Sequence, residues 1–220
     1  MQPADRVTVI ACGALAHELA MLRRALGEAA FKISCLPPEL HNTPTLIPAA
    51  VATAVREAQQ AGERVFVAYA DCGTGGLLDG VLAELKVERL PGAHCYEFFA
   101  GSQAFAQLAD AEPGTFYLTD FLVWHFERLV AQSLGIDRHP ELIGEYFKHY
   151  RRVVYLRQGA SQQWTQKASE IAARLGLEFV ERVTGLGDLS VKLQKVLGRD
   201  NLSLVIEGAA RPDQPARLVG

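Results

Sequence analysis

The most reactive side chains in this sequence belong to three cysteines that follow short apolar runs. The runs are residues 7–11, 65–70 and 87–90, and the cysteines are Cys12, Cys72 and Cys95. Such runs are typical of buried β-strands, and ligands in open α/β sheets collect at the carboxyl ends of the strands. If the strands are neighbours, the three thiols meet at one edge of the sheet. Thiolates are common zinc ligands and also suit iron, so we predict a zinc or iron site at these cysteines.

The spacing of the cysteines does not by itself indicate a metal site, because the sequence contains no Cys-x-x-Cys motif. Each cysteine taken alone is better explained as a small apolar residue packed behind a tight turn. Their shared position after strands is what favours a site. Cys35 falls inside the predicted strand at residues 31–36, and we expect it to belong to the core.

Acid–base groups flank two of these thiols. His94 directly precedes the third cysteine of the set, Glu97 comes shortly after it, and Asp71 directly precedes the second. We predict that His94, Glu97 and Asp71 are catalytic groups. His94, Glu97 or Glu18 would complete or flank the metal site. A metal with an open coordination position activates a thiol or a water molecule, which is the chemistry that such groups assist.

A glycine-rich segment, Asp71-Cys72-Gly73-Thr74-Gly75-Gly76, links a predicted strand to a predicted helix. Backbone N–H groups in such a loop bind anions with help from the helix dipole, although this segment matches neither the Walker loop nor the dinucleotide-binding fingerprint. We predict that Gly73, Thr74, Gly75 and Gly76 contact a small ligand such as a carboxylate or phosphate. Two other interpretations stay open: a thiolate activated at a helix N-terminus, and a tight turn that requires positive φ.

Three more polar residues are predicted to bind a ligand. His41 and Asn42 form a polar pair in a loop that Pro37 and Pro38 hold out of helix. Asp120 follows another predicted strand. Its first expected role there is to cap a helix, and its second is to contribute to a site. We therefore predict ligand contacts at His41, Asn42 and Asp120.

Strands and helices alternate along the whole chain. Strands are predicted at residues 7–11, 31–36, 65–70, 87–90, 115–119, 153–157, 179–183 and 202–206. Helices are predicted at residues 14–26, 47–61, 77–85, 94–108, 121–132, 137–150, 164–175 and 189–197. The alternation predicts an α/β fold, a mostly parallel open sheet with helices on both faces, as one large domain or two small βα lobes. The domain covers residues 7–208, with any lobe boundary near residues 133–152 and a flexible tail at residues 209–220.

Composition excludes several classes of function. The chain has 220 residues, of which 49% are hydrophobic and 21% charged, as in ordinary globular domains. A net charge of −3 gives no electrostatic basis for binding nucleic acid or an anionic membrane. We find neither a signal peptide nor an apolar run of about 20 residues that could span a bilayer. We expect a cytoplasmic protein whose thiols stay reduced.

Several motifs occur in an order that resembles a known family. They are Ala11-Cys12-Gly13-Ala14-Leu15 with Glu18, Leu36-Pro37 with Leu40-His41-Asn42, the glycine-rich segment, Gly92 with His94-Cys95-Tyr96-Glu97, Thr119-Asp120 and Asp137-Arg138-His139-Pro140. Together they are similar to the bacterial and archaeal family catalogued as domain of unknown function 1638, from about residue 7 to residue 190. The resemblance implies association with corrinoid-dependent methyltransferase systems of one-carbon metabolism. It implies a corrinoid protein or a methyltransferase as partner, without specifying a reaction.

Three functions are compatible with these observations. The first is a zinc- or iron-binding protein of corrinoid-linked one-carbon metabolism, with the metal at Cys12, Cys72 and Cys95. The second is a non-catalytic module that binds a small anion or a corrinoid protein through the glycine-rich segment and His41-Asn42. The third is a cofactor-independent thiol enzyme in which Cys12 and Cys72 act as acid and base. A homodimer that binds a small molecule is the default expectation.

Overall fold

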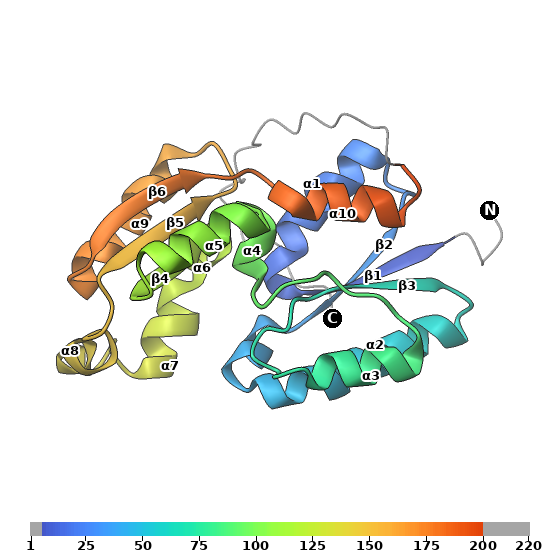
Figure 1. Ribbon diagram of the computed structural model, residues 1–220, viewed down its shortest axis with the longest axis horizontal. Coiled ribbons are helices and arrows are strands. Elements are labelled where there is room, and N and C mark those ends of the chain that lie inside the picture. Colours follow the sequence, from blue (N-terminus) through green and yellow to red (C-terminus); the bar gives the residue numbers. More distant parts are fainter. Residues whose placement is uncertain (1–5, 200–220) are drawn as a thin grey trace. The chain divides into compact units, whose positions relative to one another are not determined.

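The computed structural model describes residues 6–199, which form two compact units (Figure 1). Within these residues, the first unit comprises residues 6–98 and 188–199, and the second comprises residues 99–187. The division does not fall near residues 133–152, where the sequence suggested a boundary. That stretch connects two strands that pair with each other in one sheet, so it lies inside the second unit.

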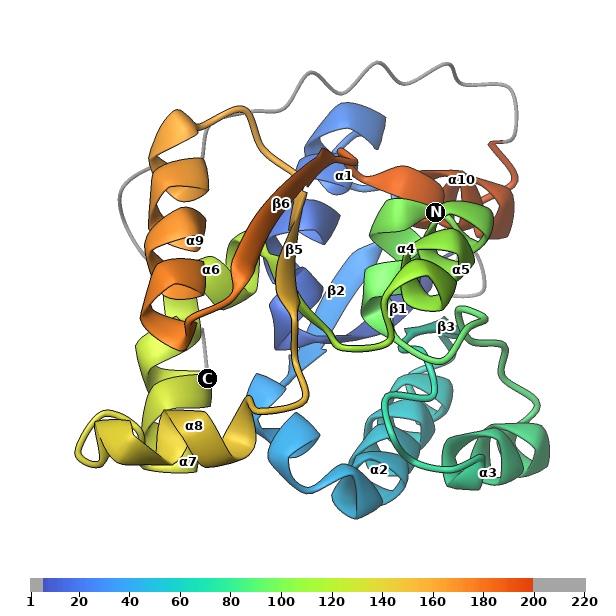
Figure 2. The same ribbon diagram turned by 60° about the vertical axis from the view of Figure 1, so that its left-hand side comes forward.

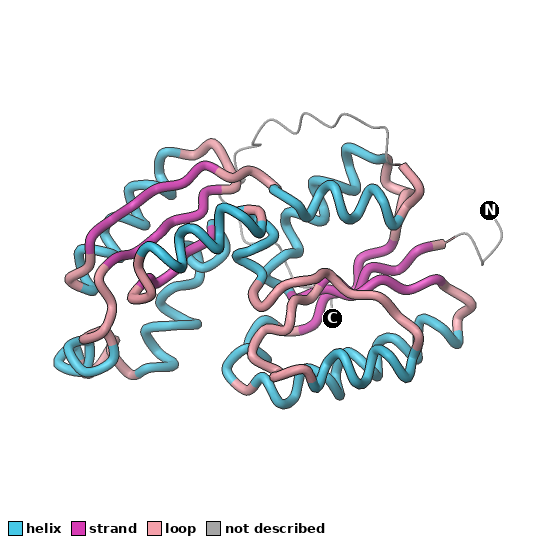
Figure 3. Tube along the Cα trace, in the orientation of Figure 1, coloured by secondary structure: helices cyan, strands magenta, loops and turns pink. Residues whose placement is uncertain are grey.

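The first unit contains a three-stranded parallel sheet with the strand order β2-β1-β3. Its strands are β1 (Val7–Cys12), β2 (Lys32–Leu36) and β3 (Arg64–Ala68). Its helices are α1 (Ala16–Leu26), α2 (Ile47–Gln60), α3 (Leu77–Leu85) and α10 (Gly187–Val196). Helix α4 (Cys95–Ala100) begins in this unit. All six residues of the central strand β1 are buried. Ala11 in β1 pairs with Cys35 in β2 and with Ala68 in β3. The strands, drawn in magenta in Figure 3, are parallel, so their carboxyl ends lie at one edge of this sheet.

An apolar stripe explains how α1 packs in this unit. Leu15, Leu19, Leu22 and Leu26 recur at steps of three or four residues, and all four side chains are buried. This spacing places them on one face of a helix. Full burial of one such side chain stabilises the fold by roughly 1.5–3 kcal/mol. The helix predicted at residues 14–26 is therefore confirmed, with a 3-10 turn as its first residues.

The second unit contains another three-stranded parallel sheet, with the order β4-β5-β6. Its strands are β4 (Thr115–Thr119), β5 (Arg152–Arg157) and β6 (Glu178–Val183); its helices are α5 (Ser102–Ala111), α6 (Asp120–Phe126), α7 (Gln132–Leu134), α8 (Ile143–Tyr146) and α9 (Gln162–Leu175). Helices α6 and α9 contact each other and pack beside the strands (Figure 2). Val153 and Tyr155 of β5 share a buried core with Trp164 and Ala168 of α9. The predicted α/β fold with parallel strands is therefore confirmed, as two small sheets.

Several predicted elements differ in detail. Residues 87–90 form only an isolated bridge, Val67 to Arg89, because Pro91 and Gly92 end the extended segment at once. The helix predicted at residues 94–108 is split into α4 and α5 at Gly101. The helix predicted at residues 121–132 contains a π-helical turn, Glu127–Ala131. The predicted strand 202–206 and the tail 209–220 lie outside the described residues.

Within residues 6–199, no helix combines the length and the apolar character that crossing a membrane requires.

Candidate functional site

Cys12 is the last residue of β1, and its side chain is 3% exposed. Its sulfur accepts a hydrogen bond from the N–H of Ala14 at 3.3 Å and lies 3.7 Å from Nδ1 of His41. Burial raises the pKa of the Cys12 thiol to about 12, and the Ala14 N–H offsets only part of this effect. The thiol is therefore neutral at physiological pH.

Cys72 lies in the turn that follows β3, with φ of 51°. An L-residue in this left-handed region costs roughly 1–2 kcal/mol relative to the right-handed one, and such strain concentrates at functional sites. The adjacent Gly73, Gly75 and Gly76 also have positive φ, but Cys72 alone in this turn carries a side chain there. Burial raises its pKa to about 11.

Two backbone hydrogen bonds join the Cys72 turn to the chain that leads into α4. The N–H of Asp71 donates to the carbonyl of Gly92 at 3.0 Å, and the N–H of Cys72 donates to that of Ala93 at 2.9 Å. This pairing places the start of α4, where Cys95 is the first residue, next to the turn. These two hydrogen bonds, together with the isolated bridge between Val67 and Arg89, therefore position the third thiol.

The thiols of Cys12, Cys72 and Cys95 are close enough to influence one another electrostatically. Burial raises the pKa of Cys95 well above its ordinary value, and the thiols of Cys72 and Cys12 raise it further. Cys35, half-buried within β2, has a pKa raised by burial to about 11, and its thiol also acts on Cys12. The parallel pairing of β1 and β3 places the segments that carry Cys12 and Cys72 at one edge of the sheet.

His41 is half-buried on the 3-10 turn Pro38–Asn42 that follows β2. Its Nδ1 lies 3.2 Å from the carbonyl of Pro38. Because a carbonyl only accepts, this contact assigns the proton to Nδ1 and leaves Nε2 with a lone pair. Burial lowers the pKa of His41, so the imidazole is neutral at pH 7. Its neighbour Asn42 is exposed.

Tyr69 belongs to this cluster, although the sequence analysis did not select it. It follows β3, its side chain is 1% exposed, and its ring stacks on His41 with centroids 6.2 Å apart. Its hydroxyl makes no hydrogen bond to any residue that the structure describes. A buried hydroxyl without a partner costs about 1–3 kcal/mol. The sequence feature that could have identified Tyr69 is its position at the end of a strand, three residues before Cys72.

The glycine-rich segment folds around its own aspartate. Oδ1 of Asp71 accepts hydrogen bonds from the hydroxyl of Thr74 at 2.7 Å and the N–H of Gly76 at 2.8 Å, and Oδ2 accepts one from the N–H of Gly75 at 3.1 Å. These bonds, with that from Gly76 the strongest, lower the pKa of Asp71. The N–H groups that were predicted to bind an external anion therefore bind this carboxylate, while Gly73 remains exposed.

The other predicted acid–base groups have different surroundings. His94 is exposed, and its ring centroid lies 6.3 Å from that of Tyr96. Oε2 of Glu97 accepts a hydrogen bond from the N–H of Ala93 at 3.2 Å, which holds the first turn of α4. Glu18 is buried in the first turn of α1. Of these groups, His94 is the one whose ring is open to solvent beside a cysteine.

Asp120 lies in the second unit, where its buried carboxylate accepts several hydrogen bonds. Oδ1 accepts from the hydroxyl of Tyr155 at 2.6 Å and the N–H of Gln158 at 3.2 Å, and Oδ2 accepts from the N–H of Gly159 at 2.8 Å. The N–H of Asp120 donates to the side-chain carbonyl of Gln158 at 2.8 Å. The carboxylate is 2% exposed, and it ties the end of β4 to the loop after β5.

The described part of the chain contains no three side chains of Cys, His, Asp or Glu that are already arranged to hold a metal ion. The thiols of Cys12, Cys72 and Cys95 influence one another electrostatically without forming such a set.

Comparison with protein families matches residues 35–192 to a family described as "Protein of unknown function (DUF1638)". This match covers more than half of the chain. The chain belongs to this family. The resemblance of the ordered motifs is thus confirmed, although the matched range begins after the motif that contains Cys12. Comparisons with curated proteins and with solved structures find no match.

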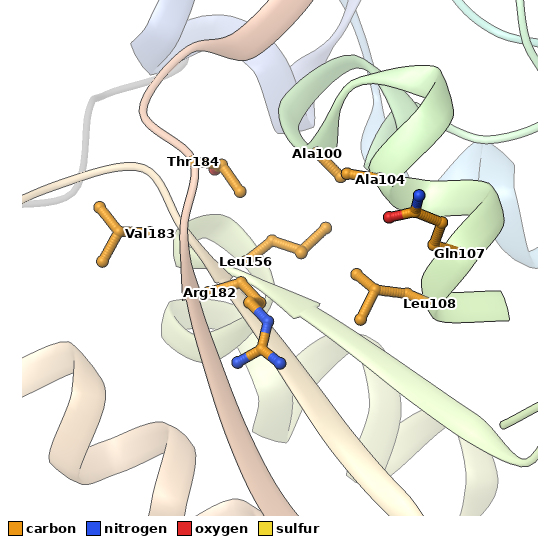
Figure 4. A pocket seen from close by; sticks show the side chains of 8 residues that line it. All are labelled: Ala100, Ala104, Gln107, Leu108, Leu156, Arg182, Val183 and Thr184. Atoms are coloured by element: carbon orange, nitrogen blue, oxygen red, sulfur yellow. The ribbon is translucent and has the colours of Figure 1, made fainter. Parts of the chain in front are cut away.

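The second unit of this DUF1638 protein contains a cavity of about 310 Å³ near the carboxyl ends of β5 and β6 (Figure 4). The residues that line it are Ala100, Ala104, Gln107, Leu108, Leu156, Arg182, Val183 and Thr184. Their side chains are mainly small or apolar, and Arg182 already donates to the carbonyl of Glu181. None of the residues predicted to bind a ligand lines this cavity.

The raised thiol pKa values lead to a test of reactivity. In the metal-free DUF1638 protein at pH 8, we expect Cys12 and Cys72 to react with iodoacetamide at least tenfold more slowly than in the urea-unfolded chain, because only the thiolate reacts. Their reaction rates should keep rising above pH 9, since their pKa values are about 12 and about 11. Peptide mapping by mass spectrometry measures each site. Labelling at neutral pH as fast as in the unfolded chain would instead support the thiol-enzyme hypothesis.

Proposed function

We propose that this protein binds one zinc or iron(II) ion through the thiolates of Cys12, Cys72 and Cys95. The observation that carries the proposal is that three thiols influence one another electrostatically: the buried Cys12 and Cys72, which lie at or beyond the ends of β1 and β3, and the half-buried Cys95, which begins α4. A single buried cysteine is an ordinary core residue, whereas three that interact electrostatically form the donor set that zinc and iron prefer.

The strained backbone at Cys72 supports the proposal independently. The turn there requires positive φ, and glycine adopts such φ without the steric cost that a side chain incurs. A cysteine at this position keeps its thiol next to the other two in spite of that cost. Such an arrangement is expected where the side chain has a function.

The proposal also specifies a proton balance. Burial keeps the three thiols protonated in the metal-free protein, and a bound cation would displace these protons because it stabilises thiolates directly. His41 is one candidate for the fourth position, because its ring lies near the Cys12 sulfur and burial lowers its pKa and so favours the neutral imidazole. His94, beside Cys95, is the other candidate for this position or for proton transfer near it. A bound ion with an open position would supply Lewis-acid activation of a thiol or water.

The two alternatives have weaker support. A thiol enzyme that uses Cys12 and Cys72 needs lowered thiol pKa values, whereas burial raises both. A module that binds anions through the glycine-rich segment needs free N–H groups, whereas those of Gly75 and Gly76 donate to Asp71.

The wider context of the proposal comes from the family. We place the protein in corrinoid-linked methyl metabolism, with a corrinoid protein or methyltransferase as partner and a small molecule at the metal. Reduced thiols suit the cytoplasm, which is the compartment we propose. A homodimer is proposed on the general frequency of symmetric oligomers. Co-purification with a corrinoid protein tests the proposed partner. If no such protein co-purifies, the partner proposal fails, and the metal site is tested by the separate experiment below.

The test of the metal site is zinc affinity measured by competition with a chromophoric chelator. Serine variants of Cys12, Cys72 and Cys95 should each bind zinc at least tenfold more weakly than the wild type, because a hydroxyl is a poor substitute for a thiolate. The matched control is Cys35→Ser, which changes a thiol within β2 and should keep the affinity. Equal affinities in all four variants would rule out this ligand set.

A further inference from the structure

The cavity near the carboxyl ends of β5 and β6 is not part of the proposed metal site, because all the described residues that line it lie in the second unit. Its volume is about 310 Å³, and pockets that bind small molecules begin at roughly this size. At about 30 Å³ for each water-sized atom, it has room for about ten non-hydrogen atoms. Ligands of α/β sheets commonly bind at the carboxyl ends of parallel strands. The cavity therefore has the size and the location of a site for a small molecule.

The register of the second sheet determines which side chains face this cavity. Leu156 of β5 pairs with Arg182 of β6, so both side chains point to the same face of the sheet. Figure 4 shows Leu156 between Arg182 and Leu108 of α5, whereas Val183, the next residue of β6, points away. Ala104, one turn before Leu108 on the same face of α5, also lines the cavity and occupies little of it. The cavity is therefore an apolar space between α5 and the sheet, with one guanidinium at its edge.

Arg182 has no carboxylate partner among the described residues. Its Nη1 donates to the carbonyl of Glu181 at 2.9 Å, whereas Nε and Nη2 donate to no residue within residues 6–199. The carboxylate of Glu181 is bound elsewhere, because it lies 3.0 Å from Nε of Arg157 and accepts a hydrogen bond from the hydroxyl of Thr165 at 2.6 Å. The Nε–H and Nη2–H groups of an arginine form a planar fork that binds a carboxylate through two hydrogen bonds. Arg182 thus keeps a complete carboxylate-binding edge beside the cavity.

The lining favours a ligand with a single negative charge. Arg182 is the one charged residue among those that line the cavity in the described part of the chain. A dianion such as phosphate would bring a second charge that no lining residue neutralises, and apolar walls make such a charge costly. The hydroxyl of Thr184 already donates to the carbonyl of Arg157 at 3.2 Å, which leaves the amide of Gln107 as a second polar contact. A monocarboxylate with a short hydrocarbon chain matches both the single cation and the apolar walls.

We propose that this cavity binds a small aliphatic monocarboxylate, with its carboxylate on the guanidinium of Arg182 and its hydrocarbon chain against Leu108 and Leu156. Ala104 limits the length of the chain that fits, because any larger side chain at this position would fill the same space. The inference goes beyond the metal site and is independent of it: it requires neither a metal ion nor any of the cysteines.

The first test measures the affinity of the full-length chain for hexanoate by isothermal titration calorimetry, with neutral hexanamide and inorganic phosphate as comparison ligands. Hexanoate should bind about tenfold more tightly than either, because only hexanoate combines one charge with an apolar chain. Arg182→Gln should weaken hexanoate binding about tenfold or more, since it removes a charged contact with two hydrogen bonds. The matched control is Arg151→Gln, at an exposed residue just before the amino end of β5, and it should keep the affinity.

The second test blocks the apolar part of the cavity and leaves Arg182 in place. Ala104→Leu should also weaken hexanoate binding about tenfold or more, because the larger side chain fills the space of the ligand. The control is Ala106→Leu, at an exposed residue of α5 that does not line the cavity, and it should keep the affinity. Leucine and alanine both favour helix, so neither variant should unfold α5. In the wild type, hexanoate should shift the amide resonances of Ala104 and Thr184.

The possible results distinguish the site from the ligand class. Absence of hexanoate binding at millimolar concentrations would overturn the proposal as a whole. Binding that persists unchanged in Arg182→Gln or in Ala104→Leu would overturn the location. Equal affinity for hexanoate and for phosphate or hexanamide would overturn the assignment of a monocarboxylate. None of these measurements involves a metal ion, so failure of the zinc titration would leave this inference standing.

Discussion

Replacement of Asp120 by alanine is expected to lower the free energy of unfolding of the second unit by about 3–5 kcal/mol. The carboxylate accepts hydrogen bonds from Tyr155, Gln158 and Gly159, and all three donors would lose their acceptor. A buried donor without a partner costs about 1–3 kcal/mol. The loss is a large part of the roughly 5–15 kcal/mol that stabilises an ordinary domain.

Tryptophan fluorescence during urea unfolding measures this effect selectively. The chain has two tryptophans, Trp124 and Trp164, and both lie in the second unit, where their rings are 4.8 Å apart. The control is Asp110→Ala, at an exposed residue of α5, and it should change the free energy of unfolding by less than about 0.5 kcal/mol. A drop of less than 1 kcal/mol for Asp120→Ala would contradict the structural role and return Asp120 to the candidates for ligand binding.

Gly92→Ala is expected to weaken the connection between the Cys72 turn and α4 by about 2–4 kcal/mol. Gly92 has φ of 106°, which strains any residue with a side chain. A methyl group there would also lie 2.5 Å from Oε2 of Glu97, which would have to leave the N–H of Ala93. The carbonyls of Gly92 and Ala93 accept the hydrogen bonds that hold the turn.

Amide hydrogen exchange at Cys72 reports this change directly, because its N–H donates to Ala93. Exchange should accelerate in Gly92→Ala, and addition of Glu97→Ala should restore part of the protection by removing the crowding. The control is Gly80→Ala in α3, where an added methyl group meets nothing within 4 Å. That variant should be neutral or stabilising by up to about 1 kcal/mol, since alanine favours helix. Unchanged exchange at Cys72 in Gly92→Ala would show that this pairing does not fix the turn.

Much of the fold follows from local patterns in the sequence. The leucine stripe of α1 and the apolar runs of β1, β3 and β5 predict these elements because burial dominates their placement. The short stretch at residues 87–90 was predicted as a strand, but only one bridge forms there. Whether such a short segment forms a strand depends on its pairing with residues that are distant in sequence, and local propensity does not contain that information.

The candidate site was predictable only in part, for a similar reason. Strand ends bring Cys12 and Cys72 to one edge, and this was visible from their positions after apolar runs. The role of Glu97 depends on the N–H of Ala93, and that of Asp71 depends on how its own turn closes. In the sequence Tyr69 cannot be distinguished from an ordinary apolar strand residue, because its stacking on His41 and the burial of its hydroxyl depend on tertiary structure. Side-chain direction at the end of a strand is a property of tertiary packing.

The most direct test of the central claim is the metal content of the protein purified without a metal-binding tag, measured by inductively coupled plasma mass spectrometry. The proposal predicts close to one zinc or iron per chain, with the metal lost from a variant in which Cys12, Cys72 and Cys95 are all serine. Protein that contains no metal as purified, and takes up none after incubation with zinc or with iron(II) under reducing conditions, would contradict it.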